Sequence, residues 1–230
     1  MTSGNLLART ITQTLASVAV MGGILFLAAG DWRWPQAWAF LAIFMGATAV
    51  VSAFLLRRDP GLLDQRLGGI ARKGQAGWDR LFMVAIMIAW FAWLALMALD
   101  ARRWQDSHLP PWLNAVGALL VIGGIAAVMP VFAANSFAAP VVTIQQERGQ
   151  HVIDTGPYAL VRHPMYAAAM LYLIGMPLLL GSWYGLIGTL VIALGIAWRA
   201  TREEQALVQG LPGYEAYMAR VPWRLVPYVW

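Results

Sequence analysis

The sequence predicts an all-α, polytopic membrane protein with five to six transmembrane helices and a cytoplasmic, amphipathic C-terminal helix. Two observations lead to this fold class. The chain of 230 residues is 60% hydrophobic and only 12% charged, a composition that soluble domains of this size do not reach. Its apolar residues are also gathered into runs that reach or approach the roughly 17–25 residues of a spanning helix.

The apolar runs lie at 11–30, 35–56, 81–99, 111–133, 164–181 and 183–199. The first run is longer than the roughly 7–15 apolar residues of a secretory signal, so we expect it to be a retained span. The next three runs are also long enough to span. The last two are short, and we expect them to form a tight hairpin whose turn lies in residues 181–185. This leaves five and six crossings both open.

Two polar segments lie outside the apolar runs. The loop 57–80 alternates apolar and basic residues, so it is either a short amphipathic piece in the membrane interface or a solvated basic loop. Residues 201–220 carry apolar side chains at helical spacing, interrupted near 210–213 by Gly-Leu-Pro-Gly. This pattern predicts an amphipathic helical tail with a break in it.

The distribution of Lys and Arg predicts the orientation, because these residues accumulate in cytoplasmic loops. With the N-terminus inside, only Arg33, Arg102 and Arg103 of the 16 basic residues lie outside. Both termini and the segments 134–166 and 199–230 are then cytoplasmic. The net charge of +5 is explained by contact with anionic membrane lipids, and we expect no nucleic acid partner.

The absence of cysteine excludes disulfides, thiolate metal sites and a cysteine nucleophile. The histidines are His108, His151 and His163, with no His-x-x-x-His pair. We therefore expect no bound metal, and we expect His108 to be solvated in an outer loop.

The polar residues that could carry chemistry fall into two motifs. Residues 156–166 read Gly-Pro-Tyr-Ala-Leu-Val-Arg-His-Pro-Met-Tyr and open onto an apolar run. Pro164 suits the first turn of a helix, so His163 is expected beside free backbone N–H groups that favour an anion. Residues 199–207 place two guanidiniums and two adjacent carboxylates at the end of a hydrophobic helix. Such charges either serve a ligand or pair with one another at the membrane surface.

The two motifs, followed by Tyr-x-x-Tyr-x-x-Arg-Val-Pro from Tyr214, resemble the isoprenylcysteine carboxyl methyltransferase family and its phospholipid N-methyltransferase relatives. The resemblance covers about 135–227, and the first four helices match only in being apolar. It implies one integrated membrane domain with an N-terminal four-helix region, 1–133, and a cofactor-binding and catalytic region, 134–230. It also implies S-adenosylmethionine at the cytoplasmic face and a lipid-like acceptor that enters between helices from the membrane.

The resemblance further implies roles for individual residues. Glu203 would meet the ammonium group of the cofactor, and Arg199, one helical turn earlier, would hold the polar head of the acceptor; these two are the catalytic candidates. The expected cofactor-binding residues are Gln145, Gln150, Val152, Ile153, Tyr158, Arg162, His163, Pro164, Met165, Tyr166, Glu203 and Glu204. Two positions depart from the family pattern, since Gln150 stands where relatives commonly carry His and Ala168 where Gly is common.

The residue types also fit methyl transfer without the resemblance. Transfer from a sulfonium is an in-line displacement that needs orientation and exclusion of water, and no covalent nucleophile. The Arg199 guanidinium can bind two oxygens of a carboxylate or phosphate at once. Tyr158 and Tyr166 can face a sulfonium through cation–π attraction.

We therefore expect an S-adenosylmethionine-dependent methyltransferase acting on a lipid or lipidated acceptor similar to an isoprenylcysteine carboxylate. One alternative is an NADPH-dependent membrane reductase of the sterol type, which shares the His-Pro-x-Tyr segment. The adjacent carboxylates Glu203 and Glu204 would repel the phosphates of such a dinucleotide. Another alternative is a non-enzymatic membrane scaffold, in which Arg199 and Glu203 could be changed freely.

The composition also bears on the source and the acceptor. One Lys beside fifteen Arg, with abundant Ala, indicates a GC-rich genome and hence a bacterial inner membrane. Prenylated proteins can be absent from bacteria. Prenylcysteine, phospholipid and other lipophilic acceptors therefore stay open.

Overall fold

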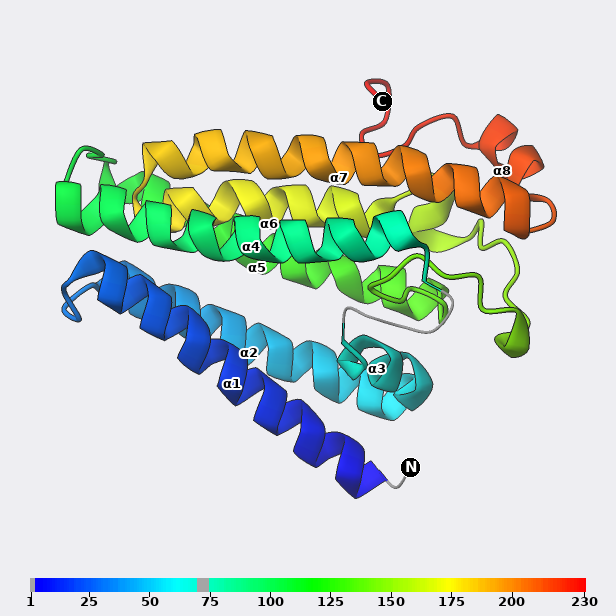
Figure 1. The fold of residues 1–230 in the computed structure, drawn as a ribbon, viewed down its shortest axis with the longest axis horizontal. Coiled ribbons are helices and arrows are strands. Elements are labelled where there is room, and N and C mark those ends of the chain that lie inside the picture. The colour runs from blue at the N-terminus through cyan, green and yellow to red at the C-terminus, as the bar shows by residue number, and fades with distance from the viewer. Residues whose placement is uncertain (1–2, 70–74) are drawn as a thin grey trace.

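The computed structural model describes residues 3–69 and 75–230 (Figure 1). Within these residues the regular structure is helical and contains no strand, which confirms the all-α prediction. The helices are α1 Ser3–Ala29, α2 Pro35–Arg58, α3 Pro60–Leu67, α4 Gly77–Ala98, α5 Pro111–Ala134, α6 Pro164–Leu180, α7 Trp183–Gly210 and α8 Tyr214–Arg220. Shorter turns are the π-helical η1 Leu99–Trp104 and the 3-10 turns η2 Gln146–Arg148 and η3 Gly156–Ala159.

The membrane-length helices agree with the predicted spans. Among the described residues, five helices are long and apolar enough to cross a membrane: α1, α2, α4 continued by η1, α5 and α7. Helix α6 is apolar but has only 17 residues. The prediction of five to six transmembrane helices is therefore confirmed, with α6 as the short one.

Helices α4 to α7 run nearly parallel to one axis, and α1 and α2 are tilted against it (Figure 1). Both termini, α3 and α8 lie at one end of the bundle, which we call the termini end, and the α1–α2 and α6–α7 connections lie at the opposite end. Helices α4 to α7 pack together, and the α1–α2 pair lies against them with α1 diverging toward its N-terminus. This arrangement places the residues 135–163 and the end of α7 together.

Glycine permits the close approach of α5 and α6. A Cβ on Gly117 would lie 2.2 Å from the backbone nitrogen of Leu179, and one on Gly175 would lie 2.7 Å from the carbonyl oxygen of Gly117. No side chain fits at these positions, so the two backbones touch. The core around this contact includes Leu94, Met97, Val121 and Met176, each fully buried.

The hairpin between α6 and α7 is tighter than the sequence predicts, and α7 is longer. Gly181 adopts the left-handed conformation with φ of +86°, and Ser182 caps α7 by accepting a hydrogen bond from the Gly185 backbone N–H. Helix α7 then runs for 28 residues through the charged motif to Gly210. The motif is therefore carried on the membrane helix itself.

The loop 57–80 contains the amphipathic piece that was one of its two predicted forms. Asp59 caps α3 through a 2.8 Å hydrogen bond from the Leu62 backbone N–H, and Leu62 and Leu63 are buried against α1 and α2. Arg72 and Lys73, which contribute to the predicted charge pattern, lie outside the described residues.

The predicted break near 210–213 separates α7 from α8, and Gly213 there has a φ of +85°. After α8 the chain returns to the start of α6. The Arg162 backbone N–H donates to the Trp223 carbonyl and the His163 N–H donates to the Arg224 carbonyl, both at 2.9 Å. The C-terminal segment thus fixes the loop that precedes α6.

Candidate active site

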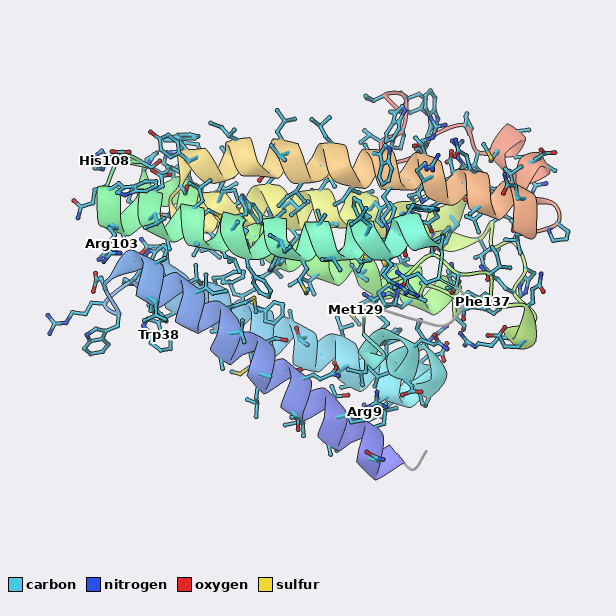
Figure 2. The ribbon with its side chains drawn as sticks, viewed as in Figure 1. Arg9, Trp38, Arg103, His108, Met129 and Phe137 are labelled. Carbon is cyan, nitrogen blue, oxygen red and sulfur yellow. The ribbon has the colours of Figure 1, made fainter. Side chains whose placement is uncertain are left out.

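A cavity that encloses about 810 Å³, part of it open to solvent, lies at the termini end between the segment 135–163, α6, α7 and α8. Its lining of aromatic and apolar side chains with a few polar groups is typical of a small-molecule site. Most of the residues expected to bind a cofactor line it: Gln150, Val152, Ile153, Tyr158, Arg162, His163, Pro164, Met165, Tyr166 and Glu203. Gln145, Glu204 and Arg199 do not belong to its lining. Figure 2 shows Phe137, another lining residue, at the end opposite to His108.

The start of α6 places two aromatic rings in the cavity wall. Pro164 is the first residue of α6, as predicted, and His163 precedes it as the N-cap residue. The His163 imidazole stacks on the Tyr166 ring, with 5.3 Å between centroids and 9° between planes. The rings therefore present a continuous aromatic surface to the cavity.

Glu204 does not belong to the cavity lining but binds residues around it. Its side chain is buried, and Oε1 accepts a hydrogen bond from Arg162 Nε at 2.6 Å and lies 3.3 Å from His163 Nε2. Its Oε2 accepts from Arg224 Nε at 2.8 Å. Arg162 also donates to the Val221 carbonyl at 2.7 Å. Glu204 thus ties α7 to the loop before α6 and to the C-terminal segment, and its carboxylate is engaged by the fold.

Glu203, the adjacent residue, turns to the cavity instead. Its Oε2 accepts a hydrogen bond from the Tyr166 hydroxyl at 2.6 Å. Among the described residues, no cation forms an ion pair with Glu203 and no group donates to its Oε1. A half-buried carboxylate in this position can receive a positively charged ligand group.

Arg199 is engaged inside the protein. Its Nε donates to Asp79 Oδ1 at 3.0 Å and its Nη2 donates to the Pro140 carbonyl at 2.8 Å, while its guanidinium lies 5.8 Å from the centre of the Tyr166 ring. Asp79, which is fully buried, also accepts from the Val142 backbone N–H at 2.9 Å. The pair therefore joins α7 and α4 to the segment that forms one wall of the cavity.

Sequence reasoning missed Asp79. It stands in the first turn of α4, ahead of an apolar run, and that placement is the one signal in the sequence. Its partner is 120 residues away, so no local pattern indicates the pair.

Tyrosine phenols form much of the polar wall. The Tyr158 hydroxyl accepts from Asn135 Nδ2 at 2.8 Å, and burial raises its pKa to about 12. Tyr214 and Tyr217 also line the cavity, and burial raises the pKa of both phenols. The sequence motif contains these two residues, but they were not among the expected site residues. All three phenols are neutral at pH 7 and so act as apolar walls with polar tips.

Gln145 and Gln150 shape the loop beside the cavity. Gln150 Oε1 accepts from the Gln145 backbone N–H at 2.7 Å, and Gln145 Nε2 donates to the Phe137 carbonyl at 3.0 Å. Gln145 therefore supports the wall from outside, whereas Gln150 forms part of it. Within the described part of the chain, no group of three or more His, Cys, Asp or Glu side chains could hold a metal ion.

Comparison with known proteins agrees with this picture. Residues 112–211 match the model of the phospholipid methyltransferase family. The matched segment, less than half of the chain, runs from α5 to the residue after α7 and contains the loop, α6 and the charged motif. A search of the curated proteins gives no match. The family match and the membrane-length helices support a membrane methyltransferase that acts on a lipid. The match confirms the resemblance carried by the motifs: over residues 112–211 the chain is similar to the phospholipid methyltransferase family.

Proposed function

We propose that the protein is a membrane-embedded methyltransferase that uses S-adenosylmethionine to methylate a lipid or lipidated acceptor. The observation that carries this proposal is the contrast between Glu204, which is fully engaged by cations of the fold, and Glu203, which lines the cavity without one. The cavity therefore offers one negative charge to a ligand that brings a positive charge.

The residues of the cavity fit the parts of S-adenosylmethionine. Glu203 is suited to the ammonium group of its amino-acid part, and the stacked rings of His163 and Tyr166 are suited to its sulfonium or its adenine. When bound, this cofactor supplies an electrophilic methyl group on a positively charged sulfur. The tyrosines around it remain neutral and exclude water, which favours an in-line displacement.

Arg199 takes a different role from the one that the resemblance implies. Its Nε and Nη2 donate to Asp79 and to the Pro140 carbonyl, and Arg199 does not belong to the lining of the cavity. We propose that Arg199 is a positioning residue, which holds Tyr166 and the 140–142 segment in place. Glu203 is the residue of the motif that touches the cofactor.

We further propose that the reaction takes place at the cytoplasmic face of a bacterial inner membrane, and the location of the site supports the choice of face. Both termini and the cavity lie at the same end of the bundle (Figure 1). The basic loops at this end favour the cytoplasmic side. An acceptor similar to an isoprenylcysteine carboxylate and a phospholipid are both compatible with that location.

The test is calorimetric titration of the detergent-purified protein with S-adenosylhomocysteine, the product form of the cofactor, and with NADPH in parallel. Saturable binding of S-adenosylhomocysteine without NADPH binding supports the methyltransferase. Binding of NADPH alone would assign the cavity to a reductase, and binding of neither would favour a scaffold.

A further inference from the structure

Arg66, in the N-terminal half of the chain, reaches the wall of the cavity. It lies on α3, where its Nη1 donates to the Ala138 carbonyl at 3.0 Å and lies 3.7 Å from the sulfur of Met165. Ala138 and Met165 both line the cavity. The guanidinium also lies 4.5 Å from the centre of the Phe132 ring. These contacts fix the cation beside the site from an element outside the matched family segment.

The charge of Arg66 has no acidic partner among the described residues. The two acidic residues close to it in the chain have other contacts, because Asp64 pairs with Arg9 at 2.6 Å and Oδ1 of Asp59 caps α3. The Nε and Nη2 groups of Arg66 form no hydrogen bond within the described part of the chain. A partly buried guanidinium in this state gains free energy when an anion binds it.

Two further effects show that the charge is present at the site. Burial lowers the pKa of Arg66 to about 10, so the side chain stays positive at neutral pH. Glu203 raises the pKa of the Tyr158 phenol and Arg66 lowers it. Both charges therefore act on the same ring of the cavity wall, one negative and one positive.

Helix α3 also borders an apolar groove between α1 and α2. The groove is lined by Leu7, Ile11, Leu15, Met45, Leu56 and Leu63, among others, and encloses about 710 Å³ that is partly open. Leu63 belongs to the same hydrophobic cluster as Ala138 and Met165. One short helix thus separates a hydrocarbon-lined groove within the spans from the proposed methyl-transfer cavity.

On the basis of the proposed function, we infer that Arg66 binds the anionic headgroup of the acceptor, a phosphate or a carboxylate, while the hydrocarbon chain of the acceptor lies in the α1–α2 groove. The acceptor would then span α3, with its head at the cavity and its tail in the membrane. This assignment gives the N-terminal helices a part in acceptor selection.

The test measures binding of two amphiphiles to the full-length, detergent-purified protein: N-acetyl-S-farnesylcysteine, which carries a carboxylate, and dihexanoyl phosphatidylethanolamine, which carries a phosphate. Arg66→Gln is expected to weaken binding of at least one by about 10- to 100-fold, because a charge-assisted hydrogen bond is lost. The amphiphile affected identifies the headgroup. Arg66→Lys is expected to lose about threefold to tenfold, because it keeps the charge but not the planar fork.

Two controls sharpen the result. Arg57→Gln removes one positive charge from an exposed position at the termini end. This variant is expected to bind both amphiphiles with the affinity of the parent. The methyl ester of N-acetyl-S-farnesylcysteine lacks the anion, so the parent and Arg66→Gln are expected to bind it equally. Thermal unfolding of each variant checks that it is folded.

The inference is overturned if Arg66→Gln and Arg57→Gln bind both amphiphiles with equal affinity. It is also overturned if Arg66→Gln weakens binding of the methyl ester as much as it weakens binding of the acid. If Arg66→Gln does not fold, a parent-like affinity in Arg66→Lys for both amphiphiles overturns it as well. S-adenosylhomocysteine titration of the same preparation separates the two proposals. The parent protein could bind no S-adenosylhomocysteine and still bind the amphiphiles in a way that depends on Arg66. That result would contradict the proposed cofactor and support the proposed headgroup site.

Discussion

The two ends of the bundle each bury a carboxylate, but they use it differently. At the end opposite the termini, Oδ2 of Asp100 accepts from the hydroxyls of Ser107 and Ser182 and from the Tyr184 backbone N–H. All of these donors are neutral. Oδ1 of Asp100 is buried without a partner among the described residues. The Asp100 carboxylate thus connects η1, the loop that follows it and the start of α7 through bonds to protein groups.

At the termini end, Glu204 collects two arginines and a histidine, and the next residue back along α7 lines a cavity. The cations of the fold are used on Glu204, which leaves the carboxylate of Glu203 to a ligand. The comparison teaches that buried carboxylates bonded only to protein groups serve the structure, whereas Glu203, which lines the cavity, is the carboxylate that we propose for ligand binding. Substitutions at the two ends can break or sharpen this distinction.

The largest expected effect follows from Glu204→Ala. The change leaves Arg162 and Arg224 without their carboxylate, and removing one partner of a buried ion pair lowers the free energy of unfolding by about 3–5 kcal/mol. Thermal unfolding in detergent measures it. Glu147→Ala, at an exposed carboxylate, is the control and should unfold as the parent does. A parent-like Glu204→Ala would show that the cluster does not hold the C-terminal segment.

Arg199→Ala should lower the free energy of unfolding by about 3 kcal/mol, because it strands the fully buried Asp79. The double variant Asp79→Ala with Arg199→Ala should recover part of that loss, since no unpaired charge remains. The same two proteins are assayed for turnover. If the double variant recovers full turnover, Arg199 serves only the stability of the fold. If turnover stays low although stability recovers, Arg199 also positions Tyr166 or the acceptor.

Asp100→Ala should cost less, about 1–3 kcal/mol, because the groups left unpaired are neutral. Its affinity for S-adenosylhomocysteine should equal that of the parent, because Asp100 lies at the end opposite the cavity. Thermal unfolding and calorimetry on one preparation measure both quantities. A large loss of affinity in this variant would contradict the separation of the two ends.

The smallest effect on stability is expected from Glu203→Gln. The amide keeps an acceptor for the Tyr166 hydroxyl, so the free energy of unfolding should change by less than about 1 kcal/mol. If Glu203→Gln strongly lowers the free energy of unfolding, the Glu203 carboxylate stabilises the fold as Glu204 and Asp100 do, which would contradict the distinction.

Local patterns predicted much of the fold. The apolar runs gave the spans, Gly181 marked the hairpin turn, and the Gly-Leu-Pro-Gly sequence marked the end of α7. Each of these is set by residues close together in the chain. The length of α7 was not predicted, because the apolar run ends at 199 while the helix continues through the polar residues that follow it, as far as Gly210. Those residues are good helix formers, so the helix does not end where its apolar residues end.

The site was predicted less completely. The resemblance predicted a cofactor pocket formed in part by the segment 152–166, and the structure places Val152, Ile153, Tyr158 and the residues from Arg162 to Tyr166 in the wall of one cavity. That this cavity binds the cofactor stays a prediction. The opposite uses of Glu203 and Glu204 depend on the rotation of α7 against its neighbours, which adjacent residues in a sequence do not reveal. The Asp79–Arg199 pair and the approach of Arg66 to Met165 depend on contacts between distant segments. Long-range pairing of this kind needs the fold.

The most direct test of the account is the affinity of Glu203→Gln for S-adenosylhomocysteine, measured by calorimetry against the parent in the same detergent. In the described part of the chain, Glu203 lines the cavity and forms no ion pair, so removing its charge should weaken binding about tenfold or more, with the thermal unfolding midpoint nearly unchanged. Equal affinity in the two proteins would contradict the assignment of Glu203 and, with it, the proposed cofactor site.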